Sequence, residues 1–307
     1  MILTVCLSPC IDVNIEVNSL GVGKSHTIIS KRIFFTGKAI NVAIGVARLR
    51  SEAFSTGFMY DGNGSQFEQE LHREGVPYKF IWNEGRVREN YKFIDHKSML
   101  TEINDISPAV SEEKQEELIN LVKQLSTTCE AVVISGSLAK GMTPDYYGKI
   151  LSVIPVDVKK IVDTEGERLF SSLKQSVDLV KPNIDELERT LNKKLRTKND
   201  MLNGCYEILD RGAKRVLLSL GKNGAILTDG KLNLYSKSVN VAMNSTLGAG
   251  DAMVAAAANA LVLGETTENI LRCGVAAGTA AVTSPDSISF SKSKYDEILS
   301  SLSVKEI

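Results

Sequence analysis

The sequence predicts an α/β fold: a doubly wound, mainly parallel sheet flanked by helices, with a small separate β-sheet lid. Six short runs are apolar almost throughout, as strands buried on both faces of a parallel sheet should be. Segments with helical periodicity lie between these runs, and this alternation is typical of α/β proteins. A chain of 307 residues is near the upper limit of one hydrophobic core, so we expect a single domain over 1–307.

The buried strands are expected, in chain order, at 2–7, 53–59, 131–136, 160–164, 178–183 and 216–221. The first helix is expected at 39–49, where one face carries Ile40, Ala43, Ile44 and Ala47. Further helices are expected at 65–75, 112–125, 184–191 and 251–263. The helix at 65–75 is expected to begin with a capping box between Ser65 and Glu68 and to end at Gly75.

Two segments interrupt this order, because their polar and apolar residues alternate. Residues 12–35 contain DVNIEV and HTIISKRIFF, and residues 87–104 contain VRENYKFID and MLTEIN. Alternation predicts strands with one solvated face. We expect these two excursions, about 12–35 and 87–104, to assemble the β lid. Its sheet edges and apolar face would offer a surface for a homodimer.

Charge and hydropathy exclude several classes of function. Lys and Arg number 36 and Asp and Glu number 37, so the net charge of -1 provides no basic excess for nucleic acid. The longest apolar stretch, 252–263, is broken by Asn259 and is too short to span a bilayer. The start, MILTVCLSPC, lacks the basic region of a signal peptide. We expect a cytoplasmic protein that binds neither nucleic acid nor a membrane.

The cysteines and histidines do not have the spacing of a metal site. The five cysteines lie at 6, 10, 129, 205 and 273, without a pair of CxxC motifs, and the three histidines are far apart. We expect free, mostly buried thiols in a reducing compartment.

Two glycine-containing segments match nucleotide-binding motifs only in part. NSLGVGKS (18–25) ends as a P-loop does, but Asn18 takes the place of its first glycine and the segment lies among lid strands. GAGDAM (248–253) has two glycines of a dinucleotide motif, but Met253 replaces the third and the segment comes late in the chain. Neither motif is therefore a good interpretation.

The turn 246–250, which begins at Thr246, has a physical basis for binding an anion. Its glycines let backbone N–H groups converge, and the start of the following helix adds a partial positive charge. The same donors are expected to keep Asp251 ionised. A carboxylate beside such a turn could act as a base that orients a substrate hydroxyl. The N–H groups of the turn would stabilise the phosphoryl group during its transfer. The alternative is an ordinary aspartate at the start of a core helix.

Seven motifs spread over most of the chain carry a family resemblance. NSTLGAGDAMVA (244–255) and TGKAINVAIGVARL (36–49) resemble the two signatures of the ribokinase-like, phosphofructokinase-B family of sugar kinases. Five shorter motifs follow the family's order: LSPCID (7–12), VREN (87–90), SGSLAKG (135–141), VKPNIDEL (180–187) and SLGKNGA (219–225). The fold that the resemblance implies, a doubly wound α/β domain with a β lid, agrees with the one expected above.

The resemblance also implies roles for residues of a sugar site. Asp251 matches the general base that takes the proton of the acceptor hydroxyl, and the anion hole corresponds to Gly248, Ala249 and Gly250. Sugar hydroxyls would be bound by Asp12, Gly37 and Asn41. A phosphate already on the substrate would be bound by Lys38 and Arg88, with Lys24 as a weaker candidate.

A second group of residues resembles the family's ATP site. Its wall corresponds to Lys181, Ser219, Gly221 and Gly224. Asn183 and Glu186 match an NxxE element that organises water around Mg²⁺ near the nucleotide phosphates. ATP and Mg²⁺ are therefore implied. Taken alone, Asn183 and Glu186 are equally a capping box for the helix at 184–191, and the two glycines a tight turn between strands.

Three positions depart from the family pattern. Thr36 replaces the first glycine of the N-terminal pair, Ala39 replaces the glycine after Lys38, and Ala139 replaces a common proline. The methyl group of Ala39 is expected to lie where the backbone approaches the sugar, and so to trim or shift the substrate pocket.

These observations indicate an ATP-dependent kinase whose substrate already carries a phosphate. Within the family, Lys38, Arg88 and the TEIND segment (101–105) resemble the 1-phosphofructokinase and tagatose-6-phosphate kinase branch. Our first expectation is conversion of fructose 1-phosphate to fructose 1,6-bisphosphate, and our second is conversion of tagatose 6-phosphate to tagatose 1,6-bisphosphate. A free-sugar kinase comes third, because it would leave the two cations without a dianion. A non-catalytic sugar-phosphate sensor and a nucleotide-dependent oxidoreductase are the rivals from other classes.

Overall fold

The structure is a computed structural model that describes residues 1–97, 99–242, 244, 247–284 and 290–307. Its strands are β1 (Ile2–Cys6), β2 (Cys10–Val17), β3 (Ile28–Thr36), β4 (Ala53–Tyr60), β5 (Tyr78–Asn83), β6 (Arg88–Ile94), β7 (Leu100–Asn104), β8 (Ala131–Ser135), β9 (Lys159–Asp163), β10 (Leu179–Val180), β11 (Val216–Ser219), β12 (Ala225–Thr228), β13 (Asn233–Ser236) and β14 (Val304–Glu306). Its helices are α1 (Lys38–Arg48), α2 (Ser65–Arg73), α3 (Glu112–Ser126), α4 (Tyr146–Ser152), α5 (Glu167–Leu173), α6 (Ile184–Leu191), α7 (Lys198–Asp210), α8 (Ala249–Val262), α9 (Thr267–Val282) and α10 (Lys292–Ser301).

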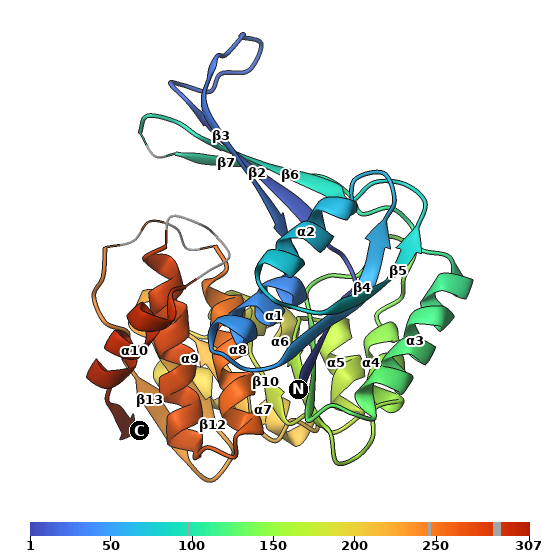
Figure 1. The fold of residues 1–307 in the computed structure, drawn as a ribbon. Coiled ribbons are helices and arrows are strands. Elements are labelled where there is room, and N and C mark those ends of the chain that lie inside the picture. Colours follow the sequence, from blue (N-terminus) through green and yellow to red (C-terminus); the bar gives the residue numbers. More distant parts are fainter. Residues whose placement is uncertain (98, 243, 245–246, 285–289) are drawn as a thin grey trace.

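The predicted fold class is confirmed. Among the described residues, ten strands form a sheet in the order β14-β13-β12-β11-β10-β9-β8-β1-β4-β5. The strands from β11 to β5 are parallel, whereas β12, β13 and β14 extend the sheet antiparallel. Helices α1, α8 and α9 pack together on one side of this sheet, and α3, α4 and α5 on the other (Figure 1).

Each of the six predicted buried strands is present, but one is much shorter than expected. The run at 178–183 forms only the two residues of β10. Pro182 has no backbone N–H to donate to a neighbouring strand, and Asn183 already caps α6. The strand β10 therefore ends at Val180, although Asn183 still forms an isolated bridge with Ser219. Lys181 and Asn183 thus lie at the carboxyl edge of the sheet.

The predicted capping box at the start of α2 is wrong. Gly64 occupies the N-cap position, and no side chain caps the helix. Ser65 already lies inside the first turn, because the backbone oxygen of Gly64 accepts a hydrogen bond from the N–H of Phe67. The expected end is confirmed, since Gly75 has a φ of 68° and its N–H donates to the oxygen of His72.

The two excursions supply the strands of a separate lid sheet. In the order β3-β2-β6-β7, the central pair β2–β6 is parallel and the outer pairs are antiparallel. Figure 1 shows this sheet projecting from the α/β body, with the β2–β3 loop at its tip. Polar residues of one face, among them Asp12 and Asn90, are register partners on β2 and β6 and face a cavity.

Small residues bring α1 and α8 into close contact. A Cβ atom on Gly45 would lie 2.7 Å from the Cβ of Ala255, so only glycine fits at this crossing. The close contact fixes the start of α8 above the carboxyl ends of β8 and β9. No helix within the described part of the chain is long and apolar enough to cross a membrane.

Candidate active site

Two cavities open where the parallel strands end, the usual position of ligands in α/β sheets. The first has a volume of about 650 Å³ and is lined by the five residues that sequence reasoning placed near a nucleotide: Lys181, Asn183, Ser219, Gly221 and Gly224. The second has a volume of about 560 Å³ and lies under the polar face of the lid. The two cavities share Lys181, Asn183 and Gly250.

The second cavity contains most of the residues predicted for a sugar site. These are Asp12, Gly37, Lys38, Asn41, Arg88, Gly248, Gly250 and Asp251. Glu186, predicted to act near the nucleotide phosphates, lines this cavity as well. Ala249, predicted for the anion hole, lines the first cavity instead. The predicted sets are thus brought together around one junction, even though they come from segments far apart in the sequence.

The turn before α8 stands at that junction. Gly248 is the N-cap of the helix in a left-handed conformation, with a φ of 75°. The ammonium group of Lys181 lies beside the first turn of the helix, since a Cβ atom built on Gly250 would be 3.4 Å from its Nζ. Thr246, the first residue of the predicted turn, lies outside the described residues. Backbone N–H groups at a helix start next to a lysine favour a bound anion.

Asp251 lies in the first turn of α8 and is buried. Asn41 of α1 donates a hydrogen bond from Nδ2 to Oδ2 of Asp251 at 2.7 Å. Burial raises the pKa of Asp251 to about 6, although the nearby charge of Lys38 opposes this shift. Sequence reasoning expected the donors at the helix start to keep this carboxyl ionised; desolvation, which the sequence did not show, raises its pKa above the usual value. A carboxylate with a pKa near 6 is mostly ionised at neutral pH and is well matched to accept a proton.

A buried charge network surrounds this carboxylate. Asp163, at the end of β9, lies between two ammonium groups, with its oxygens 3.4 Å from Nζ of Lys38 and 3.2 Å from Nζ of Lys181. The hydroxyl of Ser135 donates to Asp163 at 2.8 Å. Burial alone would raise the pKa of Asp163, but Lys181 and Lys38 together lower it. Asp163 in turn raises the pKa of Lys38 despite its desolvation, so this lysine is a fixed cation.

Glu186 has two roles in the structure. It forms the capping box with Asn183, whose Oδ1 accepts from the N–H of Glu186 at 2.8 Å while Oε2 of Glu186 accepts from the N–H of Asn183 at 2.9 Å. The structural alternative for this pair is therefore confirmed. The second oxygen, Oε1, lies 3.2 Å from Nζ of Lys38 and faces the cavity.

The lid end of the second cavity is built around Asp12. Its carboxylate accepts hydrogen bonds from Nδ2 of Asn90 at 3.1 Å and from Nζ of Lys92 at 2.7 Å. Arg88 donates from Nη1 to Oδ1 of Asn90 at 3.1 Å. Gly37 has a φ of 156°, and a Cβ atom there would lie 2.7 Å from Sγ of Cys6.

Lys24 is the predicted site residue that the structure does not bring to either cavity. It is exposed on the loop between β2 and β3, at the tip of the lid. Figure 1 shows this loop projecting beyond the strands of the lid, away from the α/β body. Within this chain, Lys24 therefore does not contact Lys38 or Arg88, which were predicted to bind the same phosphate.

The departures from the family pattern have different surroundings. Ala39 is fully buried and does not line the second cavity, so its methyl group packs in the core and not at the cavity surface. Thr36 does line that cavity, where its hydroxyl donates to the backbone oxygen of Cys10 at 3.2 Å and lies 3.1 Å from Sγ of the same residue. Ala139 is buried beside a neighbouring cavity.

Sequence reasoning missed several residues of this site. Those with a direct contact or a place in the cavity are Asn90, Lys92, Ser137, Asp163 and Arg168. A signal existed for Asp163, because an acidic residue ending a buried parallel strand lies at the carboxyl edge where ligands bind. Asn90 and Lys92 could be found only from the register that sets β6 beside β2.

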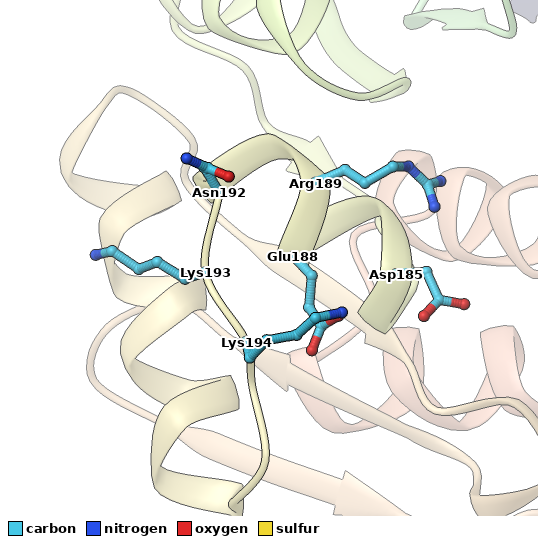
Figure 2. A pocket seen from close by; sticks show the side chains of 6 residues that line it. All are labelled: Asp185, Glu188, Arg189, Asn192, Lys193 and Lys194. Carbon is cyan, nitrogen blue, oxygen red and sulfur yellow. The ribbon is translucent and has the colours of Figure 1, made fainter.

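A smaller cavity of about 290 Å³ lies on the surface beside α6 (Figure 2). Its charged side chains are occupied by pairs on the surface, such as Lys194 with Glu188 at 2.6 Å and Arg189 with Glu165 at 2.7 Å. None of the predicted site residues lines it. We assign no chemistry to this cavity.

Comparison with known proteins gives a consistent result. Residues 1–294 match the family described as pfkB family carbohydrate kinase. A 1-phosphofructokinase of Borreliella burgdorferi is 33% identical over 281 residues, which cover 91% of each chain. A tagatose-6-phosphate kinase of Staphylococcus epidermidis is 26% identical over the full length of both chains. The crystal structure of phosphofructokinase-2 from Escherichia coli in complex with fructose-6-phosphate has a TM-score of 0.87, with 28% identity and 98% of each chain covered.

Proposed function

Since the chain belongs to the pfkB family of carbohydrate kinases and is a sugar-phosphate kinase, we propose that it transfers the γ-phosphoryl group of ATP to fructose 1-phosphate, forming fructose 1,6-bisphosphate. The observation that carries this proposal is the junction of the two cavities at Lys181, Asn183 and Gly250, directly beside Asp251. A donor in one cavity and an acceptor in the other would meet at this point.

At the junction, Asp251 would act as the general base. Its carboxylate accepts the proton of the acceptor hydroxyl as that oxygen attacks the γ-phosphorus atom. The bond between this phosphorus and the β–γ bridging oxygen breaks, and ADP leaves with the bonding electrons. Asn41 holds the carboxylate in place. The N–H groups at the start of α8, together with Lys181, stabilise the charge of the transferring group. Lys38, held by Asp163 and Glu186, adds a second fixed cation beside Asp251.

Mg²⁺ is part of the proposal, and the donor set fits it. Around the junction, Asp163, Glu186 and Asp251 provide three carboxylates, whereas Lys38 and Lys181 provide two ammonium groups. The balance is negative before ATP arrives with further negative charge, so a hard cation is favoured. The described residues contain no cluster of three or more side chains that would enclose a metal directly. Mg²⁺ commonly keeps several waters and binds through one or two carboxylates and the nucleotide phosphates. Glu186 would hold it through water, and the ion would neutralise the phosphates.

Fructose 1-phosphate is preferred as substrate because the 1-phosphofructokinase relative is the more similar of the two described above. Tagatose 6-phosphate is the second candidate, because a relative named for it covers the whole chain. Both compounds present a hydroxyl at one end and a phosphate at the other.

A kinase that consumes ATP and a sugar phosphate works where both are found, and we propose the cytoplasm as its location.

A homodimer through the lid is a further part of the proposal. Ile33, Val13, Tyr91 and Ile103 are register partners across the four strands, so they form one row on one face. The two outer members are exposed, Ile33 by 47% and Ile103 by 58%. An apolar row on a projecting sheet suits a second copy of the same surface.

A coupled ATP-consumption assay over matched substrates tests the proposed function. The set is fructose 1-phosphate, fructose 6-phosphate, tagatose 6-phosphate and fructose, each at equal concentration with ATP and Mg²⁺. We expect the highest kcat/KM with fructose 1-phosphate. A higher value with tagatose 6-phosphate or fructose 6-phosphate would reassign the substrate, and turnover of fructose alone would contradict a sugar-phosphate kinase.

A further inference from the structure

The sugar cavity is lined by five cations, and three of them lie within 3.4 Å of a carboxylate oxygen. Lys38 and Lys181 contact Asp163, and Lys92 contacts Asp12 at 2.7 Å. Lys92 and Lys181 are also almost fully buried, with 7% and 4% of their side chains exposed. These lysines are therefore held in place by the protein itself. The remaining cations of the cavity are Arg88 and Arg168.

Arg168 has an incomplete set of partners. Its Nη2 lies 3.9 Å from Oε1 of Glu165, at the outer limit of an ion pair. Glu165 makes much shorter contacts with a different arginine, because its Oε2 lies 2.9 Å from Nε and 2.7 Å from Nη2 of Arg189. Nε of Arg168 is buried and has no hydrogen-bond partner among the described residues. The protein therefore leaves part of the hydrogen-bonding capacity of this guanidinium group unsatisfied.

Arg88, a second arginine in the lining of the same cavity, shows the same feature. Its Nη1 donates to a neutral acceptor, Oδ1 of Asn90, and its Nε is buried without a hydrogen-bond partner among the described residues. Arg88 begins β6 of the lid, whereas Arg168 lies in the first turn of α5, beyond the end of β9. Two guanidinium groups thus reach one cavity from two separate elements.

We propose that Arg168, together with Arg88, binds the phosphate that the sugar substrate already carries. This assignment rests on the proposed function and deepens it. Two guanidinium groups match the charge of a phosphate dianion, and the planar fork of arginine binds its oxygens in pairs. Lys38, which sequence reasoning assigned to the same phosphate, contacts Asp163 and Glu186 and stays at the reaction centre. Arg168 then distinguishes a sugar phosphate from a free sugar.

Steady-state kinetics of Arg168→Gln test this assignment, with Arg189→Gln as the matched control. Both arginines pair with Glu165, but Arg189 does not line the sugar cavity. We expect Arg168→Gln to raise the KM of the sugar phosphate by about 10- to 100-fold while the KM of ATP changes less than about twofold. Arg189→Gln should leave both constants within about threefold. Arg168→Lys keeps the charge but loses the fork, so its KM should lie between wild type and Arg168→Gln.

Inhibition by inorganic phosphate provides a second measurement, which reports on binding of the phosphate group without the sugar. As a competitive inhibitor against the sugar phosphate, inorganic phosphate should have a Ki raised by about tenfold or more in Arg168→Gln and unchanged in Arg189→Gln. If wild type shows no activity with any sugar phosphate, the proposed function fails. If wild type is active and Arg168→Gln behaves as Arg189→Gln does in KM and Ki, the assignment of Arg168 alone is overturned. Should Arg168→Gln fail to fold, wild-type KM and Ki in Arg168→Lys overturn it equally.

Discussion

The carboxylate of Asp163 organises the centre of the site, and Asp163→Asn isolates that role. The substitution keeps the size of the side chain and its contact with Ser135 but removes the negative charge between the two lysines. Lys38 retains Glu186 as a partner. Lys181, with 4% of its side chain exposed, would be left as a buried cation without a charged partner.

The size of the effect follows from that burial. Removing one partner of a buried ion pair typically costs about 3–5 kcal/mol of unfolding free energy. With an unfolding entropy of about 2.1 cal/mol/K per residue over 307 residues, this corresponds to a fall in Tm of roughly 5–8 °C. Because the folded pKa of Asp163 is lowered, its contribution is present above the pKa of an unfolded aspartate, about 3.9, and is lost as the pH falls through the folded pKa. The fall in Tm should therefore be equal at pH 7.5 and pH 8.5, where Asp251, with a pKa of about 6, is ionised as well.

Differential scanning calorimetry without ligands measures this difference, with Asp145→Asn as the control. Asp145 pairs with Lys149 at 2.9 Å, but both side chains are more than half exposed. Exposed pairs contribute at most about 1 kcal/mol, so the control should lose less than about 2 °C. A fall in Tm for Asp163→Asn no larger than that of the control would refute the view that Asp163 holds the two lysines in place.

Three further predictions address the base, the metal and the lid. The kcat/KM for the sugar phosphate should fall below about pH 6 as Asp251 becomes protonated. If the same fall at low pH persists in Asp251→Asn, it would belong to the substrate's own phosphate. Glu186→Gln should raise the Mg²⁺ concentration needed for half-maximal rate. The loss of Tm should be small, because Gln can keep the capping bond to Asn183. An unchanged Mg²⁺ requirement with a large loss of Tm would make Glu186 only a cap. Ile33→Lys should shift the mass measured by light scattering from dimer to monomer, whereas Val156→Lys, at an exposed position on the body, should not; equal masses for both variants would exclude the lid interface.

The sequence was sufficient to predict the elements whose structure depends mainly on neighbouring residues in the chain. Near-continuous apolar runs located the buried strands, and the glycines of 248–251 located the turn at the start of α8. Ser65 shows where local chemistry is ambiguous, since a Ser–x–x–Glu pattern fits a capping box whether it begins at the N-cap or inside the first turn.

Register and burial could not be predicted from single positions. Lys92 looks like a solvated lysine on an alternating strand, but the pairing of β6 with β2 sets it against Asp12. Asp251 was expected to be ionised because the helix start is visible in the sequence, whereas its desolvation depends on how α1 and α8 pack together. Lys24 could not be placed because the length and direction of the lid loop depend on tertiary structure.

The turnover number of Asp251→Asn tests the central claim, that this carboxylate is the general base at the junction of the two cavities. Asn keeps the size of the side chain and is acceptable in the first turn of a helix, but it cannot accept the hydroxyl proton. Under conditions where phosphoryl transfer limits the rate, kcat should fall by about 10²–10⁴-fold while ATP and the sugar phosphate bind with near-normal affinity. A variant that retains more than about a third of the wild-type kcat would contradict the assignment, and one that no longer binds ATP would make Asp251 a structural or metal-linked residue.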